Sequence, residues 1–186
     1  MRRAFFLFLL SCATGLLMQG TPSFSLLPSG GTISGAPGST VGWGFTVTDS
    51  SEYVVITGSS FTPSSLYGTY QDFTGSAALI VAGPSPENQT VSQPFDATAM
   101  SGLGAFTIFS TTPTNTKISG NLVIDYSLFS QDPNSPTFDP DTSTLVADAN
   151  VSLPAAVNVA PEPLLAPVLG LALAAVGLAA KRRKNA

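Results

Sequence analysis

The central part of the chain alternates apolar and polar residues in short runs that end at proline or glycine. The clearest runs cover residues 41–48 and 118–128, and no amphipathic helix of about ten or more residues stands between the two ends of the chain. Every second side chain of a strand points to the same face, so a period of two indicates strands with one buried face. The pattern predicts an all-β domain, an antiparallel β-sandwich of about seven to nine short strands.

Shorter runs complete the predicted set of strands. Residues 53–57 follow the turn signal Asp49-Ser50-Ser51, which indicates a hairpin with the strand at 41–48. Residues 77–82 and 105–109 are short apolar runs, interrupted only by Thr107, as expected for buried strands. A further alternating run covers residues 145–151, and it predicts one face formed by Leu145, Ala147, Ala149 and Val151.

The strand at 41–48 carries the single tryptophan of the chain. Trp43 lies on the more apolar face, so we expect it in the core. Gly42 and Gly44 lie on the other face, where they either reduce side-chain packing or let another backbone approach closely. Residues 37–48 resemble the opening strand of bacterial Ig-like modules, in which a turn precedes an alternating strand with a buried aromatic residue. This resemblance implies an Ig-like sandwich and bears on fold, not function.

Charge is distributed unevenly along the chain. Between residues 26 and 160 the only base is Lys117, and the acids there are Asp49, Glu52, Asp72, Glu87, Asp96, Asp125, Asp132, Asp139, Asp141 and Asp148. One base and ten acids give this body a formal charge of 1 − 10 = −9. A body of that charge repels a phosphate backbone, so we expect no nucleic-acid partner. The chain has no histidine and its one cysteine is Cys12, so imidazole catalysis, thiol nucleophiles and Cys/His metal sites are excluded from the body, and no cofactor is expected.

The N-terminus has the layout of a secretory signal peptide. Two arginines precede an apolar stretch at residues 4–18, and the small-x-small triplet Ser23-Phe24-Ser25 follows. The stretch is shorter than the roughly 20 residues that span a bilayer, which favours cleavage over a permanent anchor helix. We therefore expect export by the general secretion machinery and a cut by signal peptidase between Ser25 and Leu26.

The C-terminus combines three features in a fixed order. Pro161, Glu162 and Pro163 precede an apolar run at residues 164–180, and the chain then carries the basic cluster Lys181, Arg182, Arg183 and Lys184. At about 1.5 Å per residue the run would form a helix of about 26 Å, near the minimum for crossing a bilayer. The basic cluster favours the cytoplasmic side, which leaves the acidic body outside. We expect a single transmembrane helix over residues 164–180.

This arrangement resembles the PEP-CTERM protein-sorting signal of Gram-negative bacteria, in which a Pro-Glu-Pro motif precedes a short transmembrane helix and an arginine-rich end. The resemblance covers residues 161–186. It implies that an exosortase, a membrane-embedded cysteine transpeptidase or protease, recognises the tail and cuts near the motif. The two prolines favour an extended backbone, the form that a protease cleft can grip. The alternative is a plain single-pass anchor with a chance Pro-Glu-Pro.

Two further groups of residues suggest chemistry. Asp132, Asp139 and Asp141 lie in the densest oxygen-donor run and are candidates for Ca²⁺, but the run lacks the EF-hand pattern and a turn-rich solvated loop is the favoured interpretation. Asp139 and Asp141 as a glycosidase pair is less favoured still, because no basic residue is near them. A sugar-binding platform is the other alternative, and its candidates are Trp43, Tyr53, Tyr67 and Tyr70.

These features divide the chain into a signal peptide at residues 1–25, a β-sandwich at 26–153, a linker at 154–160 and a sorting signal at 161–186. The expected protein is exported, non-enzymatic and held transiently in the inner membrane with its body on the periplasmic side. Exosortase would then deliver it to the cell surface, outer envelope or extracellular matrix, where extracellular polysaccharide is a candidate partner. The alternative function is a carbohydrate- or Ca²⁺-binding adhesion module anchored by a C-terminal transmembrane helix.

Overall fold

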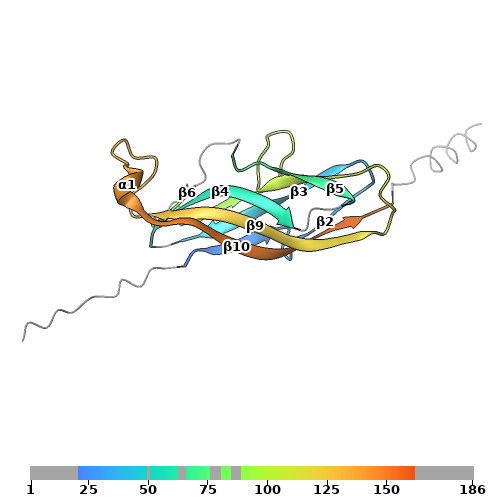
Figure 1. The fold of residues 1–186 in the computed structure, drawn as a ribbon, viewed down its shortest axis with the longest axis horizontal. Coiled ribbons are helices and arrows are strands. Elements are labelled where there is room, and N and C mark those ends of the chain that lie inside the picture. The colour runs from blue at the N-terminus through green and yellow to red at the C-terminus, as the bar shows by residue number, and fades with distance from the viewer. Residues whose placement is uncertain (1–20, 50, 63–65, 76–80, 85–88, 162–186) are drawn as a thin grey trace, which may run out of the picture.

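Two β-sheets pack face to face in the computed structural model, which describes residues 21–49, 51–62, 66–75, 81–84 and 89–161 (Figure 1). One sheet has the order β1-β3-β8-β5, with β7 also paired to β3. Its strands are β1 (Ser23–Leu27), β3 (Thr40–Thr48), β5 (Gly68–Asp72), β7 (Thr90–Gln93) and β8 (Gly104–Ile108). The second sheet has the order β2-β10-β9-β4-β6. Its strands are β2 (Thr32–Gly35), β4 (Tyr53–Thr62), β6 (Val81–Ala82), β9 (Lys117–Phe129) and β10 (Thr144–Val159). A short helix, α1 (Pro140–Ser143), precedes β10, and the predicted all-β sandwich is confirmed.

The beginning of the sandwich is shared between the two sheets. β1 pairs antiparallel with β3, and β2 pairs parallel with β10. Between these strands Gly30 and Gly31 have φ angles of 82° and 65°, which glycine adopts without steric cost. A side chain at Gly31 would also overlap the backbone of Pro154. The chain crosses from one sheet to the other here, and the prediction of a purely antiparallel sandwich is wrong for the β2–β10 pair.

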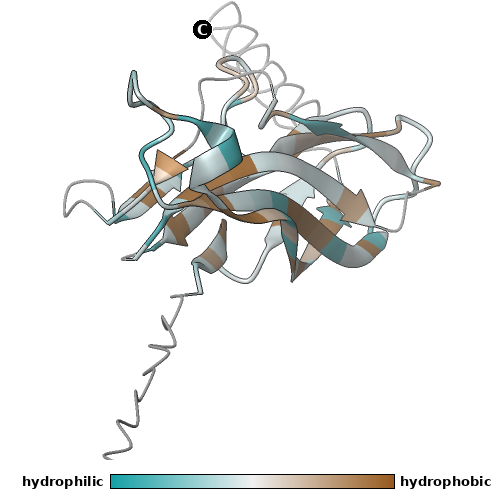
Figure 2. Ribbon diagram, turned by 60° about the vertical axis from the view of Figure 1, so that its left-hand side comes forward, coloured by the Kyte–Doolittle hydropathy of each residue, from teal (hydrophilic) through white to brown (hydrophobic). Residues whose placement is uncertain are grey.

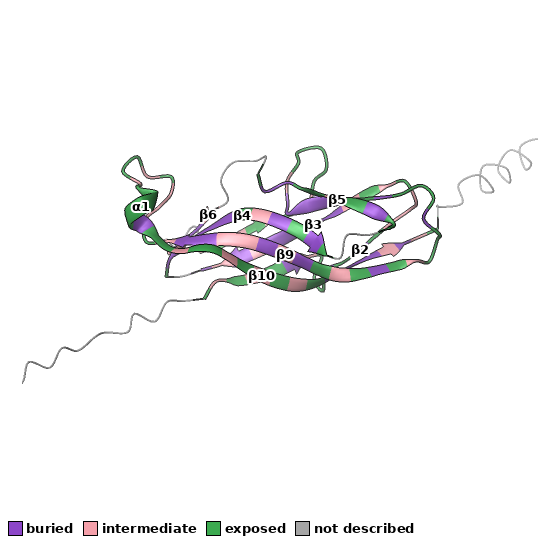
Figure 3. Cartoon of the chain, in the orientation of Figure 1, coloured by how far each residue is buried: buried purple, intermediate pink, exposed green. Residues whose placement is uncertain are grey.

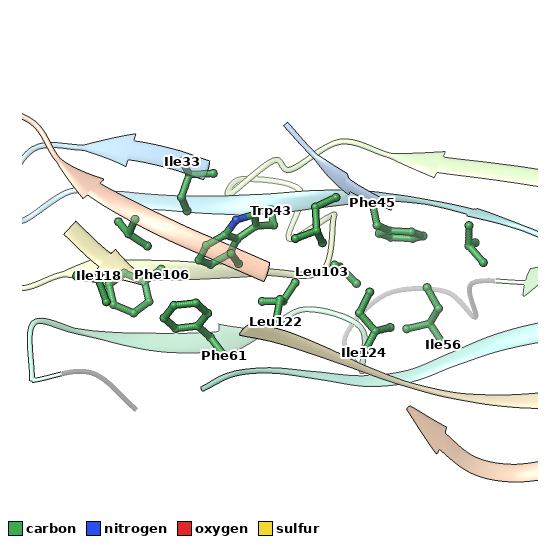
Figure 4. Packing of buried hydrophobic residues seen from close by; sticks show 14 of the residues in the cluster. Ile33, Trp43, Phe45, Ile56, Phe61, Leu103, Phe106, Ile118, Leu122 and Ile124 are labelled. Atoms are coloured by element: carbon green, nitrogen blue, oxygen red, sulfur yellow. The ribbon is translucent and has the colours of Figure 1, made fainter. Parts of the chain in front are cut away.

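The core lies between the sheets and takes side chains from both (Figure 4). Trp43 and Phe45 of β3 are fully buried, and β9 contributes Leu122 and Ile124. The predicted core position of Trp43 is confirmed, and its Nε1 donates a hydrogen bond of 2.8 Å to the carbonyl oxygen of Gly31. Buried and exposed residues alternate along much of the long strands, as Figure 3 shows.

The two glycines of β3 let a neighbouring segment lie against the outer face of the strand. A Cβ on Gly42 would overlap the ring of Phe95, and one on Gly44 would lie 2.5 Å from the carbonyl oxygen of Gln93 and 2.8 Å from Cα of Pro94. Of the two interpretations of these glycines, close approach of another backbone is therefore the correct one.

Two predicted connections are wrong. The hairpin between residues 41–48 and 53–57 does not form, because β3 and β4 belong to different sheets. The linker predicted at 154–160 is mostly strand, because β10 pairs with β9 as far as Asn158 and with β2 as far as Val159, where it ends. Since β1 begins at Ser23, the sandwich extends beyond the predicted range at both ends.

β10 changes face near its beginning. Its register against β9 shifts between Val146 and Ala149, and Asp148 has a φ of 53°. These are the signs of a β-bulge, which inserts an extra residue and reverses the alternation. Val146 packs against the core, whereas Leu145 is 42% exposed. The predicted face is therefore wrong at Leu145 and Ala147 and holds from the bulge onward.

The long axis of the sandwich separates two ends. α1 lies at one end and the last residues of β10 at the other (Figure 1). Within the part of the chain that the structure describes, no helix is long and apolar enough to cross a membrane. The predicted apolar stretch of the signal peptide at 4–18, Glu162, Pro163, the predicted helix at 164–180 and the basic cluster at 181–184 lie outside the described residues.

Candidate functional site

A groove of about 400 Å³ opens along the side of the sandwich where β4 and β5 face each other. β4 pairs with β6 only at Val54 and Val55, so the second half of β4 has no strand partner on this side among the described residues. β5 is the edge strand of the other sheet. The groove is lined by Ser60, Phe61, Gly68, Thr69, Tyr70, Phe106 and Phe109.

Aromatic rings form the inner wall of this groove. Phe61 lies 5.6 Å from Phe106 in an edge-to-face arrangement and 5.3 Å from Trp43 in a stacked one, measured between ring centroids (Figure 4). The ring of Phe106 lies against Gly68, where a Cβ would overlap it. Phe109 lines the groove with 40% of its surface exposed. The groove therefore offers apolar ring faces.

A polar cluster beside the groove joins the two sheets. Ser59 of β4 lies with its Oγ 2.8 Å from the hydroxyl of Tyr70 and 2.5 Å from Oδ1 of Asp72, both on β5, and 2.8 Å from the carbonyl oxygen of Leu103. The same Oδ1 accepts from the backbone N–H of Thr74 at 2.9 Å. A serine hydroxyl has one proton and two lone pairs, so Ser59 accepts from Tyr70 and donates to Asp72 or Leu103. The cluster holds β4 and β5 together where no strand pairing does.

Tyr70 is the one ionisable residue in the lining of the groove. Burial raises the pKa of its hydroxyl well above the usual range; the hydrogen bond with Ser59 lowers it in part, and the charge of Asp72 raises it further. The hydroxyl therefore stays protonated at physiological pH and cannot serve as a general base. The lining of this groove therefore consists of aromatic rings, neutral hydroxyl groups and Gly68.

The predicted aromatic platform does not form as one surface. Trp43 is fully buried, and Tyr70 is half-buried with its ring centroid 6.2 Å from that of Trp43. Tyr67 is 41% exposed at the end of the sandwich. Tyr53 belongs to the start of β4, at the opposite end of that strand from the groove. Of the four candidates, only Tyr70 lines the groove.

The Ca²⁺ candidates lie in the loop around α1, where their carboxylates serve the local backbone. Oδ1 of Asp132 accepts from the N–H of Asn134 at 2.8 Å, and Oδ1 of Asp139 accepts from the N–H of Asp141 at 3.0 Å as the N-cap of α1. Across the described ranges no group of three or more acidic, histidine or cysteine residues is arranged to hold a metal ion. The arrangement favours turn formation over Ca²⁺ binding.

Of the predicted processing residues, the structure describes two in the first strand and Pro161 just after the last strand. Ser25 and Leu26 are part of β1, and Leu26 is buried in the core. A cut between them would remove Phe24, whose ring centroid lies 5.1 Å from that of Tyr126. At the other end the N–H of Ala160 donates to the carbonyl oxygen of Gly35 at 2.9 Å, and Pro161 follows as an exposed residue. The predicted sorting motif therefore begins two residues after the end of β10.

Three groove residues were not singled out by the sequence. Phe61 lies beyond the strand predicted at 53–57, and Phe106 and Phe109 fall in an apolar run that reads only as a buried strand. The aromatic content of these segments was visible, but the convergence of Phe61 and Phe106 depends on the pairing of β8 with β5 and on the packing of the two sheets.

Comparison with known proteins yields little. The chain matches no protein-family model, and no curated protein matches its sequence. Among solved structures it is similar to the sixth cohesin of scaffoldin B from Acetivibrio cellulolyticus, determined in complex with a Cel5 dockerin variant. The sequence identity is 13%, the TM-score is 0.27, and the match covers 75% of this chain and 99% of that chain. A likeness of this size carries no argument about this protein.

Proposed function

We propose that this protein is an exported, non-enzymatic protein of the cell surface or extracellular matrix, sorted by an exosortase through its C-terminal signal. The observation that carries the proposal is the position of the motif. β10 ends at Val159, and Pro161, Glu162 and Pro163 stand between the sandwich and the apolar run at 164–180. A motif at that point of the sequence follows the last strand and precedes the proposed membrane helix, where a membrane-embedded enzyme would reach it.

The two ends of the sequence give the proposal its topology. The N-terminal apolar stretch directs the chain to the secretion machinery, and the basic cluster at 181–184 stays in the cytoplasm. The body then lies on the periplasmic side of the inner membrane until the tail is cut, after which it moves to the envelope or matrix. The absence of cysteine after Cys12 means that its stability outside the cell rests on packing, not on disulfides.

The strand order supports an Ig-like class of sandwich. Ig-type domains place the first, second and fifth strands of the repeat in one sheet and the last two strands beside the third in the other. Here β1, β3 and β8 lie in one sheet, and β10, β9 and β4 lie side by side in the other. Domains of this class recur in surface proteins, where they bind partners or act as spacers rather than as enzymes. The groove residues offer no group suited to acid–base catalysis.

The proposal is tested by the termini of the native protein. Intact mass and peptide mapping of protein purified from its own host should give a C-terminus between Pro161 and Leu164. Because cleavage after Ser25 would divide β1, we now expect the mature N-terminus at or before Ser23. A mature chain that retains residues 164–186 would contradict exosortase processing and leave a single-pass anchored protein. A mature chain beginning at Leu26 would contradict only the revised signal-peptidase site.

A carbohydrate-binding module is the second candidate function, and the groove between β4 and β5 is the observation that favours it. Sugar rings stack on aromatic faces, and Phe109 and Tyr70 present such faces beside the hydroxyl of Thr69. Titration of the full chain with polysaccharide from the host's own matrix should then show binding that Phe109→Ala weakens at least tenfold. Leu145→Ala, a change at an equally exposed apolar residue away from the groove, is the control. Equal binding by both variants would remove this candidate.

A further inference from the structure

The end of the sandwich where β10 finishes is built from four segments, which we call the C-terminal tip: residues 35–39, 66–68, 109–117 and 158–161. Backbone hydrogen bonds hold them together. The N–H of Ala160 donates to Gly35, and the N–H of Asn115 donates to Val159 at 2.7 Å. The N–H of Phe109 and the hydroxyl of Thr112 both donate to the carbonyl oxygen of Tyr67, each at 2.9 Å. The tip is therefore one continuous surface.

The tip differs from the rest of the body in charge. Its four segments contain no acid, although Glu162 follows the last of them in the sequence, and they contain Lys117, the one base between residues 26 and 160, which is exposed. The nearest acid along β5 is Asp72, about 13 Å from Gly68 at about 3.3 Å per residue, and Asp125 lies about 26 Å along β9 from Lys117. The acids Asp132, Asp139 and Asp141 lie at the α1 end. The body is thus polarised along its long axis.

The tip also exposes large apolar side chains. Leu66 is 89% exposed, Tyr67 is 41% exposed and Phe109 is 40% exposed. Figure 2 colours the ribbon by hydropathy, and it shows brown residues in loops as well as in the strands of the core. Around these three residues the tip presents small or polar neutral groups, among them Ser110, Thr111, Pro113 and Thr114, which are exposed. Exposed aromatic and aliphatic residues with a lysine nearby are features of surfaces that lie at a membrane interface.

The length of the chain beyond the tip limits how far the tip stands from a bilayer. Four residues, 160–163, separate Val159 from the apolar run that begins at Leu164. Fully extended, this tether reaches about 17 Å at about 3.5 Å per residue. The polar headgroup layer takes up roughly 5–7 Å of that length on each side of the hydrocarbon core. While residues 164–180 are inserted, the tip is held within about 10 Å of the headgroups.

We infer that the C-terminal tip is a lipid-facing surface, which rests against the headgroups of an anionic bilayer through Leu66, Tyr67 and Lys117 while the tail is inserted. The inference rests on the proposed function, because the tail must first enter the membrane. Contact at the tip would orient the body upright, hold the Pro-Glu-Pro segment at the membrane surface, and end when the tail is cut.

Single-cysteine labelling tests this inference, because Cys12 is the only cysteine of the chain. We would use the full chain carrying Cys12→Ser, with an environment-sensitive fluorophore at Leu66→Cys, Thr114→Cys or, as the control, Leu145→Cys. Leu145 is an exposed leucine at the α1 end. The chain is reconstituted into vesicles of phosphatidylcholine and phosphatidylglycerol that contain a nitroxide-labelled lipid. We expect several-fold stronger quenching at positions 66 and 114 than at position 145, and Lys117→Glu should reduce the difference.

Insertion is measured separately, by flotation of the vesicles after an alkaline wash. Inserted chain with equal quenching at positions 66, 114 and 145, or with none, would overturn the lipid-facing tip and leave the proposed function standing. Chain that fails to insert would overturn both. Shielding of the label at position 66 that needs no lipid and grows with protein concentration would overturn the inference in favour of contact with a second copy.

Discussion

Aspartate is used throughout this body as a turn-forming residue. Asp72, Asp96, Asp132 and Asp139 each accept a hydrogen bond through Oδ1 from the backbone N–H two residues ahead, over 2.7–3.0 Å. Asp49 does the same for Ser51. The short aspartate side chain competes well for such backbone groups, which is why it collects in turns. The acidic character of the domain is therefore largely a consequence of its many turns, and it needs no metal ion or basic partner to explain it.

Tyr70 makes a prediction about alkaline stability. Its pKa is raised in the folded protein, whereas an unfolded tyrosine ionises near pH 10. Above about pH 10 the folded state therefore holds one more proton than the unfolded state, and the free energy of unfolding falls as pH rises, by up to about 1.4 kcal/mol per unit. Below pH 10 this contribution is fully present.

Above pH 10 we expect Tyr70→Phe to reduce the fall of the unfolding free energy with pH by the contribution of about one proton, up to about 1.4 kcal/mol per pH unit. Urea unfolding at intervals from pH 8 to 12 measures it. At pH 8 the variant should be less stable by about 1 kcal/mol, because the hydrogen bond with Ser59 is lost. An unchanged slope in the variant would show that Tyr70 ionises normally and that its hydroxyl is not buried as described.

The strands show how local backbone geometry sets the faces of the sandwich. The bulge at Asp148 lets β10 pair with β9 along most of its length and still bury Val146 before the shift and Val151 after it. The left-handed φ at Asp148 is tolerated by aspartate and glycine but strained for a β-branched residue. We expect Asp148→Val to lower the free energy of unfolding by about 1–3 kcal/mol and Asp148→Gly to leave it nearly unchanged. Denaturant titration compares them, and equal losses in both would contradict the bulge.

Gly44 makes a second prediction at the level of the strand. A Cβ there meets backbone atoms of Gln93 and Pro94, which cannot rotate away as a side chain would. Gly44→Ala should therefore cost about 1–3 kcal/mol of stability or more. Gly75→Ala is the matched control, because nothing lies within 4 Å of its Cβ position and its φ is not positive. A melting temperature for Gly44→Ala equal to that of the control would mean that residues 93–95 do not lie on β3.

Much of the strand pattern could be predicted from the sequence, and the assignment of strands to sheets could not. The runs at 41–48 and 118–128 correspond to β3 and β9, because alternation of apolar and polar residues fits a strand and does not fit a helix. The partners of β3 are β1, β7 and β8, which lie far from one another in the sequence, and no local signal names them. Residues 23–25 read equally well as the end of a signal peptide and as a strand, since both favour small and apolar residues.

At the level of the whole molecule, the sequence indicated only part of the groove lining. Tyr70 is one of the aromatic candidates in the sequence. Its neighbour Phe61 comes from β4 in the other sheet, and Phe106 comes from β8, which pairs with β5 although the two strands lie far apart in the sequence. Trp43 was correctly expected in the core, because the apolar face of its strand is defined by three alternating residues. A site made by the packing of two sheets has no signature in either strand alone.

The parallel pairing of β2 with β10 has a mechanical consequence. Both strands run toward the C-terminal tip, one attached to the N-terminal part of the chain and the other to the tail. A pull between the two ends of the domain draws them in opposite directions along their own axes, so their hydrogen bonds bear the load together rather than one after another. A protein held at its tail and dragged from its far end would stretch little before it ruptures. Single-molecule pulling should give a higher rupture force between the domain's own ends than between residues 66 and 145, and equal forces would contradict this shear geometry.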